Sequence, residues 1–319
     1  MFRTKPQIGL GMVDRALAQG VRVRAWTFDE GYGRDTAFLD GLEQRRQVFV
    51  GEVPANFHGW VIKPRVLKKG PSRWRGRKNQ RKYPRLARGR RSSEVQNLVR
   101  YSPAFRKRTW QRYCIKDTER GPEVWEVKWA VFWRKGDNGL PGRRHCLIVA
   151  RNVLTGEVKY FLSNRVPGER GITLRLLLRV AFRRWSVESC FRQAKEELGL
   201  DHYEVRGWRG VHRHFYLTQL SHLFCARMRQ KFDAVAPGGD PLEHLTTEQV
   251  RRAMNVWLEA AAGRLTKTER YERELAIQRY HQRRNAQARR SHTKTRRSQL
   301  KSLGINVDRI KSCIPRSST

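Results

Sequence analysis

The chain has no long apolar run. No stretch reaches the roughly 18 consecutive apolar residues that a membrane-spanning helix needs. The first residues also hold no apolar core of a secretory signal peptide. The sequence therefore excludes a helical transmembrane segment, and we expect a cytoplasmic, nucleoid-associated protein with no membrane partner.

Paired cysteines are absent as well. The five cysteines show no Cys-x-x-Cys motif and no Cys/His spacing typical of a metal site. The cysteine spacing therefore gives no indication of a zinc ribbon or of a disulfide framework. We expect reduced thiols in packing or surface roles at Cys114, Cys146, Cys190, Cys225 and Cys313.

Acidic residues are scarce. The 319 residues include 29 Asp and Glu against 68 Lys and Arg, which gives a net charge of +39. Such a balance indicates a polyanionic partner, and the interleaved Trp, Tyr and His favour nucleic acid over a membrane surface. A hydrophobic content of 39% is enough for a real core, so the composition excludes disorder throughout and predicts one large or two modest domains.

Among the features that are present, residues 183–203 stand out. Arg184, Glu188, Phe191 and Lys195 fall at i, i+4, i+7 and i+11, so they share one stripe of a single predicted helix. The leucine-rich residues just before them predict that much of this helix is buried, with Glu188 at the edge of a core. A plain amphipathic helix with i, i+4 ion pairs fits the spacing equally well.

The first residues of the chain predict a β-α-β unit. Residues 7–19 predict a helix, 21–28 a strand, 35–45 a second helix and 47–53 a second strand, in an order suited to parallel pairing. Asp29 follows the first strand directly, at the end where α/β sheets usually carry their chemistry. A turn or helix-capping role for Asp29 is the other interpretation that the pattern allows.

A basic segment follows. Residues 61–112 contain 19 Lys and Arg and a single acid, Glu94. A run of this kind is usually a solvated tail, but inside a folded chain we interpret it as a loop that follows DNA phosphates. Three strands are predicted after it, at 125–133, 144–150 and 158–162.

The last part of the chain predicts helices. The apolar pattern indicates helices over 215–231 and 247–262, separated by a break at 237–239. Residues 279–301 hold nine Lys and Arg and no acid, and we interpret them as a basic, partly helical, partly mobile arm.

Residues 183–203 resemble the glutamate helix of insertion-sequence DDE transposases, in the group with a Tyr-x2-Arg-x3-Glu-x6-Lys signature. Arg184, Glu188 and Lys195 match the Arg, Glu and Lys of that signature, whereas its Tyr position is Ala181. Residues 28–35 and 50–54 resemble the second-aspartate block of the same family, and the resemblance extends over essentially the whole chain. It implies that Asp29 is the second catalytic acid and Glu188 the third.

The family's first catalytic Asp lies on an upstream strand. Only 28 residues precede Asp29 in this sequence, and Asp14 falls inside a predicted helix. We therefore expect a chain that lacks the family's N-terminal portion and carries an incomplete catalytic set, so that it is inactive by itself.

The resemblance also implies a fold. We expect an α/β protein in which a partial RNase H-like core is interrupted by a mostly β insertion domain and followed by a helical, basic C-terminal arm. The expected division is 1–56 for the first part of the core, 57–165 for the basic loop and insertion, 166–235 for the second part of the core, and 236–319 for the C-terminal region.

The activity implied by the resemblance is two-metal cleavage and transfer of DNA strands at transposon ends. Asp29 and Glu188 would be both catalytic residues and metal ligands for two Mg²⁺ ions, with Mn²⁺ as a substitute. The expected partners are double-stranded DNA, as terminal repeats and target, and a second copy of the chain in a synaptic complex. The expected DNA-binding residues are Arg184, Lys195, Trp185, Arg192, Arg206 and Trp208.

Two other functions stay open at this point. One is a catalytically inactive, DNA-binding remnant of a transposase. The other is a basic nucleic-acid-binding structural protein, which fits the charge but gives no reason for the spacing of Arg184, Glu188 and Lys195. Metal-dependent nicking of DNA separates the enzyme from both.

Overall fold

The computed structural model describes residues 2–67, 83–87, 91–118, 120–235, 246–262 and 267–313. The chain forms two compact units. The first comprises Met1–Thr118, Pro122–Arg184 and Arg297–Thr319, and the second comprises Glu119–Gly121 and Trp185–Arg296. The division into four segments expected from the sequence stays a prediction. The predicted break at 237–239 and residues 68–82 and 88–90 of the basic segment lie outside the described residues.

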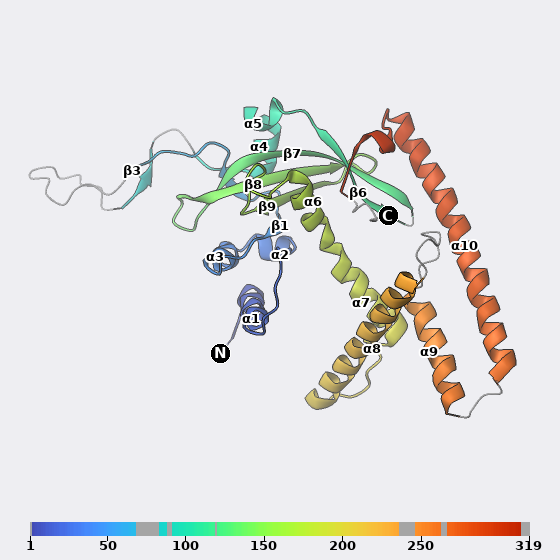
Figure 1. The fold of residues 1–319 in the computed structure, drawn as a ribbon. Helices are drawn as coiled ribbons and strands as arrows, with labels where there is room; N and C mark the ends of the chain where they lie inside the picture. The colour runs from blue at the N-terminus through green and yellow to red at the C-terminus, as the bar shows by residue number, and fades with distance from the viewer. Residues whose placement is uncertain are drawn as a thin grey trace, which may run out of the picture. The chain divides into compact units, whose positions relative to one another are not determined.

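The first unit is a mixed α/β structure built on one large sheet (Figure 1). Its helices up to residue 184 are α1 (Lys5–Ala18), α2 (Glu30–Gly33), α3 (Thr36–Gln44), α4 (Val95–Tyr101), α5 (Pro103–Arg106) and α6 (Leu174–Arg183). Its strands are β1 (Val50–Val53), β2 (His58–Trp60), β3 (Val66–Leu67), β4 (Arg85–Leu86), β5 (Ser93–Glu94), β6 (Gln111–Thr118), β7 (Gly121–Lys135), β8 (Pro141–Asn152), β9 (Val158–Ser163) and β10 (Lys311–Ser312).

The main sheet has the order β1-β9-β8-β7-β2-β5, and β6 joins β7 to β10. Strands β7, β8 and β9 form consecutive antiparallel pairs, β1 pairs antiparallel with β9, and β10 pairs parallel with β6. The mixed α/β class and the three strands expected after the basic segment are confirmed. One sheet contains both β1, which the sequence assigned to the core, and β7 to β9, which it assigned to the insertion.

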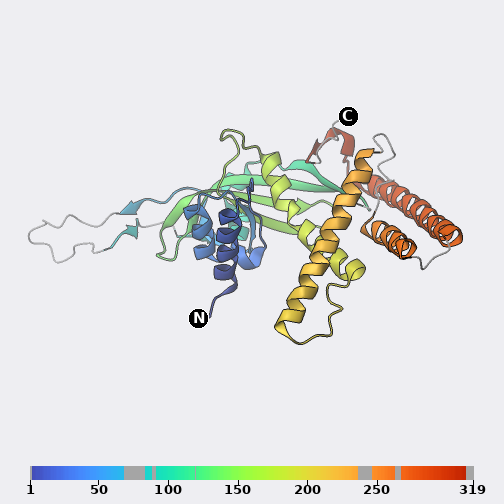
Figure 2. The same cartoon turned by 60° about the horizontal axis from the view of Figure 1, so that its bottom comes forward.

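Helices cover both faces of this sheet, so the central strand β8 is apolar on both sides. Because side chains alternate along a strand, Leu147 and Val149 pack with the helices α1 to α5, whereas Cys146 and Ile148 pack with α6. The helices α1 and α3 lie side by side in both views (Figure 2). Burial of each large apolar side chain contributes roughly 1.5–3 kcal/mol, and this two-sided core fixes the scaffold.

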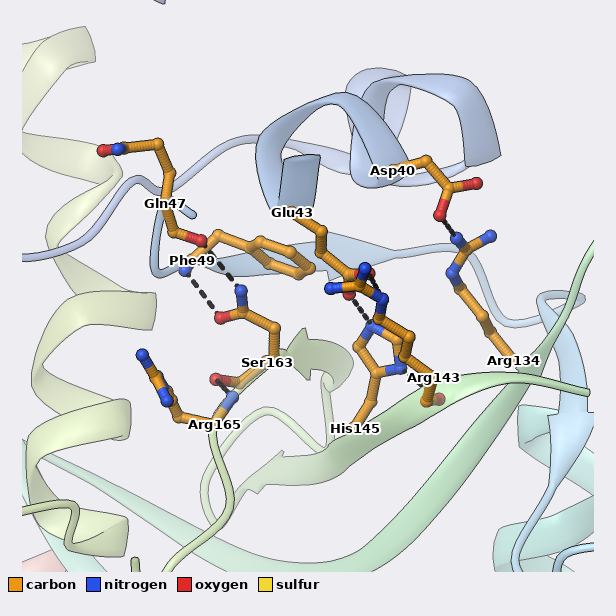
Figure 3. A network of polar contacts seen from close by, with 10 residues as sticks. Asp40, Glu43, Gln47, Phe49, Arg134, Arg143, His145, Ser163 and Arg165 are labelled. Carbon is orange, nitrogen blue, oxygen red and sulfur yellow. Dashed lines mark hydrogen bonds and ion pairs between the residues drawn. The ribbon is translucent and has the colours of Figure 1, made fainter. Parts of the chain in front are cut away.

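Helix α3 is also fixed to the sheet by a buried polar network (Figure 3). His145 of β8 places Nε2 at 2.7 Å from Oε1 of Glu43, and Nε of Arg143 lies 3.5 Å from the other Glu43 oxygen. On the same helix Asp40 pairs with the buried guanidinium of Arg134 from β7. The network positions α3, which lies shortly after Asp29 in the chain.

The predicted strand over 21–28 is wrong in its extent. Only Trp26 forms a bridge, parallel to Phe49, and Glu52 N donates to Phe28 O at 3.0 Å. The expected parallel pairing is therefore present, but only over the last residues of the segment. Val21 and Val23 are 47% and 39% exposed, so the alternating pattern at 21–25 does not correspond to a buried face.

The interpretation of 61–112 as a loop is wrong for its described C-terminal part. Residues 93–106 form β5, α4 and α5, and the side chains of Val95 and Phe105 are completely buried. Val95 and Phe105, together with Leu98 and Val99, pack into the core on the face of the sheet that α1 to α5 cover. The many cations of the segment led to its interpretation as a solvated loop, although residues 95–105 contain a short apolar pattern.

The second unit is helical. It contains α7 (Trp185–Leu198), α8 (Trp208–Val235), α9 (Thr247–Ala261) and most of α10 (Lys267–Ser302). Thr247 of α9 bonds to Gln193 of α7 at 3.2 Å, and Arg251 lies 3.4 Å from Glu197. The helices expected over 215–231 and 247–262 are confirmed, and α8 is longer than expected. Residues 279–301, which we expected to be only partly helical, lie entirely within α10. Across the described residues, we find no helix both long and apolar enough to cross a membrane.

The cysteines have the expected structural character. All five are free thiols, and four of them, all except Cys190, are buried. Burial raises the pKa of Cys114 and of Cys313 to about 11. The packing role expected from their spacing is therefore confirmed at the buried positions.

Candidate active site

Asp29 is positioned by the aromatic residue before it. Phe28 is 7% exposed, and its ring lies 5.2 Å from that of Phe38 and 5.6 Å from that of Phe49. A Cβ atom at Gly51 would lie 1.8 Å from Phe28 Cε2, so only glycine lets this ring lie against β1. The buried ring fixes the backbone at residue 28, and the next residue, Asp29, comes to the surface.

Asp29 caps a short helix. Its Oδ1 accepts a hydrogen bond from Tyr32 N at 3.3 Å, at the start of α2. Gly33, at the end of α2, packs so closely on β1 that an added Cβ would lie 1.8 Å from Glu52 O. The capping role considered for Asp29 is thus present. A carboxylate offers about four acceptor sites, so the cap leaves acceptor capacity for a cation.

A second carboxylate, Glu52, lies at the C-terminal end of β1. Its Oε1 is 3.2 Å from Lys159 Nζ of β9, and its Oε2 is 4.0 Å from Arg184 Nε. The backbone bond from Glu52 to Phe28 places it beside the segment that ends in Asp29. Glu52 and Lys159 are therefore further candidates for this site.

The sequence carries a signal for Glu52 that is independent of the family resemblance. Glu52 is the only charged residue of β1, and its neighbours Gly51 and Val53 are buried. A carboxylate on so short and so buried a strand needs a cation nearby, because burying an unpaired charge is costly. Its partner Lys159 comes from a strand that the sequence placed in a different segment.

Arg184 lies at the junction of two helices. Thr173 caps the start of α6, α6 ends at Arg183, and α7 begins at Trp185. Arg184 itself keeps helical angles, with φ −51° and ψ −40°. The single predicted helix is therefore interrupted at one residue, Arg184, which lies between α6 and α7. Arg184 is also the last residue of the first unit before the chain enters the second.

On α7, Glu188 shares an outward stripe with Phe191 and Lys195, as expected. These three side chains are exposed, whereas Ala194 on the other side of the helix is buried. The expectation that this helix is largely buried is wrong, because the leucines before it belong to α6 and bury that helix instead.

The other expected DNA-binding residues are accessible in the second unit. Trp185 is 49% exposed and Trp208 is 77% exposed, with its ring 3.9 Å from that of His212. Arg192 and Arg206 are also exposed. Exposed cations and aromatic rings are the groups that contact phosphates and stack on bases.

The site residues are divided between the two units. Asp29, Glu52, Lys159 and Arg184 belong to the first unit, whereas Glu188 and the other expected DNA-binding residues belong to the second. A single metal site that joins Asp29 and Glu188 stays a prediction. Within the described ranges, no group of three or more His, Cys, Asp or Glu side chains is placed to hold a metal ion.

The donor chemistry of Asp29 and Glu188 fits magnesium. Mg²⁺ prefers oxygen ligands and is usually bound by one or two carboxylates together with substrate phosphates and water. Both side chains are exposed carboxylates, so each can offer an oxygen to an ion that also binds DNA.

Comparison with known proteins bears on the first unit. No curated protein matches the chain. Residues 1–122, however, match the model of the DDE superfamily endonuclease family. The matched segment contains Asp29 and Glu52 and ends before Arg184 and Glu188, so the Tyr-Arg-Glu-Lys group rests only on the resemblance of residues 183–203. The match supports a DDE-type, transposase-like family for this chain.

Proposed function

We propose that the protein is a DDE transposase that cuts and transfers double-stranded DNA at transposon ends and works in the nucleoid. The observation that carries this proposal is the position of Asp29. It is an exposed carboxylate that directly follows Phe28, whose backbone is bonded to Glu52 of β1. Both Asp29 and Glu52 lie within the part of the chain that matches a DNA endonuclease family, and Glu52 faces Lys159 and Arg184.

Asp29 and Glu188 are the proposed ligands of the divalent metal, Mg²⁺ with Mn²⁺ as a substitute. When bound, two such ions activate the attacking oxygen and stabilise the leaving oxygen of a phosphodiester. The role of the protein in this chemistry is to provide the two carboxylates as oxygen ligands.

Glu52 is the proposed positioning residue for Lys159 and Arg184. Its two oxygens face Lys159 and Arg184, which come from different elements. A guanidinium has five N–H donors and an ammonium has three, so both side chains keep donors for a DNA phosphate. Glu52 thereby holds two groups that can bind phosphate at the end of β1.

The second unit supplies the proposed contacts to flanking DNA. Lys195, Arg192 and Arg206 bind phosphates, and Trp185 and Trp208 stack on bases. Two copies of the chain acting on two transposon ends complete the proposal.

Nicking of supercoiled plasmid by the full chain in Mg²⁺ or Mn²⁺ tests this function. Because the first catalytic Asp is not assigned, we expect this chain to nick weakly or not at all by itself. Any metal-dependent nicking that it shows should be abolished by Asp29→Asn, with DNA affinity unchanged within about twofold, since the variant removes no cation. The matched control is Asp35→Asn, because Asp35 also caps a helix, at Phe38 N, and asparagine caps as well as aspartate. Nicking that survives Asp29→Asn would contradict the assignment. Binding without nicking by the unmodified chain would support the DNA-binding remnant instead.

A further inference from the structure

The long helix α10 has no apolar face to bury along most of its length. It contains 36 residues, so it extends about 54 Å. Of its side chains that the structure describes, only Leu300 near the C-terminal end is buried. A helix that is polar on all sides is normally stabilised by ion pairs between neighbouring turns or by a partner outside the fold.

The cations of α10 are not evenly distributed around the helix. Arg279, Arg283, Arg290 and Lys294 are all exposed and are separated by four, seven and four residues. At 3.6 residues per turn they fall within about 60° of the circumference and extend over about 22 Å. We call these four residues the α10 basic stripe.

A different side of the same helix faces the protein. Gln282, Ala286 and Thr293 are half-buried, at spacings of four and seven residues. Gly121, with φ +92°, approaches this side so closely that an added Cβ would lie 3.0 Å from Thr293 Cα. The rotation of α10 about its own axis is therefore fixed, and the basic stripe lies outside the packed side.

No acid lies three or four positions from any residue of the stripe in the sequence. Between Arg279 and Lys301 the sequence contains no acid. Arg279 with Arg283, and Arg290 with Lys294, are like-charged pairs at i, i+4, and each such pair destabilises a helix by roughly 0.2–0.5 kcal/mol. A polyanion along this side would turn the repulsion into attraction.

We propose that the α10 basic stripe binds the sugar–phosphate backbone of duplex DNA without reading its sequence. The choice of DNA rests on the proposed function, whereas the stripe itself rests on the geometry of α10. Over about 22 Å a duplex presents roughly 13 phosphate charges, more than enough for four side chains. A straight row of cations on a rigid helix matches this linear array, and contacts from such cations to phosphates carry no sequence information.

The test compares two triple variants of the full chain. The stripe variant carries Arg279→Gln, Arg283→Gln and Lys294→Gln. The matched variant carries Arg284→Gln, Arg289→Gln and Arg296→Gln, which remove the same charge from the same helix at positions off the stripe. Arg289 and Arg296 are half-buried, so this variant also controls for lost packing. Affinity for a duplex of arbitrary sequence is measured against salt concentration without divalent metal. We expect the slope of log K against log salt to fall by about 2.7 for the stripe variant and by less than one for the matched variant.

Helix content from circular dichroism checks that both variants fold alike. Equal slope changes in the two variants would show that only overall charge matters and would overturn the stripe. A larger loss of affinity for duplex RNA or for anionic phosphatidylglycerol vesicles than for DNA would also overturn it. Nicking is scored separately: a chain that binds through the stripe but does not cut refutes only the proposed function, and a chain that cuts with an unchanged slope refutes only the stripe.

Discussion

At the scale of single residues, the buried pair of Glu43 and His145 allows a direct prediction about stability. The two side chains are 4% and 0% exposed. His145 Nδ1 lies 2.8 Å from Arg143 O, and since a carbonyl only accepts, Nδ1 carries a hydrogen. Nε2 lies 2.7 Å from Glu43 Oε1. Both nitrogens of the buried imidazole therefore lie close to an oxygen, away from water.

Glu43→Gln should therefore lower the free energy of unfolding by about 3–5 kcal/mol, the usual effect of removing one partner from a buried ion pair. Denaturant titration measures this change. As a control, Glu30→Gln removes a carboxylate from the exposed pair with Arg34 and should change stability by less than about 1 kcal/mol. Similar values for the two variants would show that the Glu43 contact is not a structural one.

The same pair predicts a pH dependence. Burial raises the pKa of Glu43, but the hydrogen bond from His145 and the nearby charges of His145, Arg134 and Arg143 outweigh burial, so the pKa lies below its ordinary 4.5. A lowered pKa in the folded state means that the stabilisation is complete above the ordinary value and is lost as pH falls through the folded one. Unfolding free energy measured from neutral pH to below 4 should thus fall more steeply in the unmodified chain than in Glu43→Gln. Parallel curves would contradict this.

The proposed role of Glu188 as a metal ligand is tested by its replacement with glutamine. Glu188→Gln should abolish metal-dependent nicking and leave DNA affinity within about twofold, because it removes a carboxylate without removing a cation. The control is Glu196→Gln, an exposed carboxylate on the same helix. If both variants nick as the unmodified chain does, the third catalytic acid lies elsewhere.

At the scale of elements, the contact between Phe28 and β1 links packing to the site. Gly51→Ala places a Cβ inside the Phe28 ring. We expect a loss of about 1–3 kcal/mol from overpacking and a loss of nicking, since Asp29 follows the displaced ring. Gly11→Ala in α1 is the control, because an added Cβ there meets nothing within 4 Å. Thermal unfolding and plasmid nicking report the two effects separately.

Elements with strong local patterns could be predicted from the sequence. The alternation along β7, β8 and β9 and the apolar spacing along α8 and α9 produced strands and helices close to the observed ones. The extent of the strand before Asp29 could not be predicted, because alternation does not show whether a partner covers the segment. The cluster around Glu52 depends on the register of β1 with β9, a pairing over more than 100 residues that no local pattern encodes.

At the scale of the whole molecule, the net charge of +39 opposes folding. Self-repulsion of like charges is screened by salt. The melting temperature of the free protein should therefore rise with added sodium chloride, in the range where DNA affinity falls. Differential scanning calorimetry measures the first effect, and a flat or falling melting temperature would show that local ion pairs dominate.

The first unit is completed by the end of α10. Leu300 is fully buried and packs with Val124 and Ile305. Leu300→Ala should cost about 2–5 kcal/mol, as for other large-to-small changes in a core. Leu303→Ala is the matched control, since Leu303 is 51% exposed, and should change the denaturation midpoint little.

The chain order of the first unit also has a consequence for synthesis. Residues 297–313, which include Leu300 and β10, belong to the first unit but follow the whole second unit in the sequence. On the ribosome, where chains grow at roughly 5–20 residues per second, β6 therefore waits for its parallel partner until more than a hundred further residues have been translated. During that interval this edge of β6 has no β10 to pair with, so the edge is closed only after the residues of the second unit have been made.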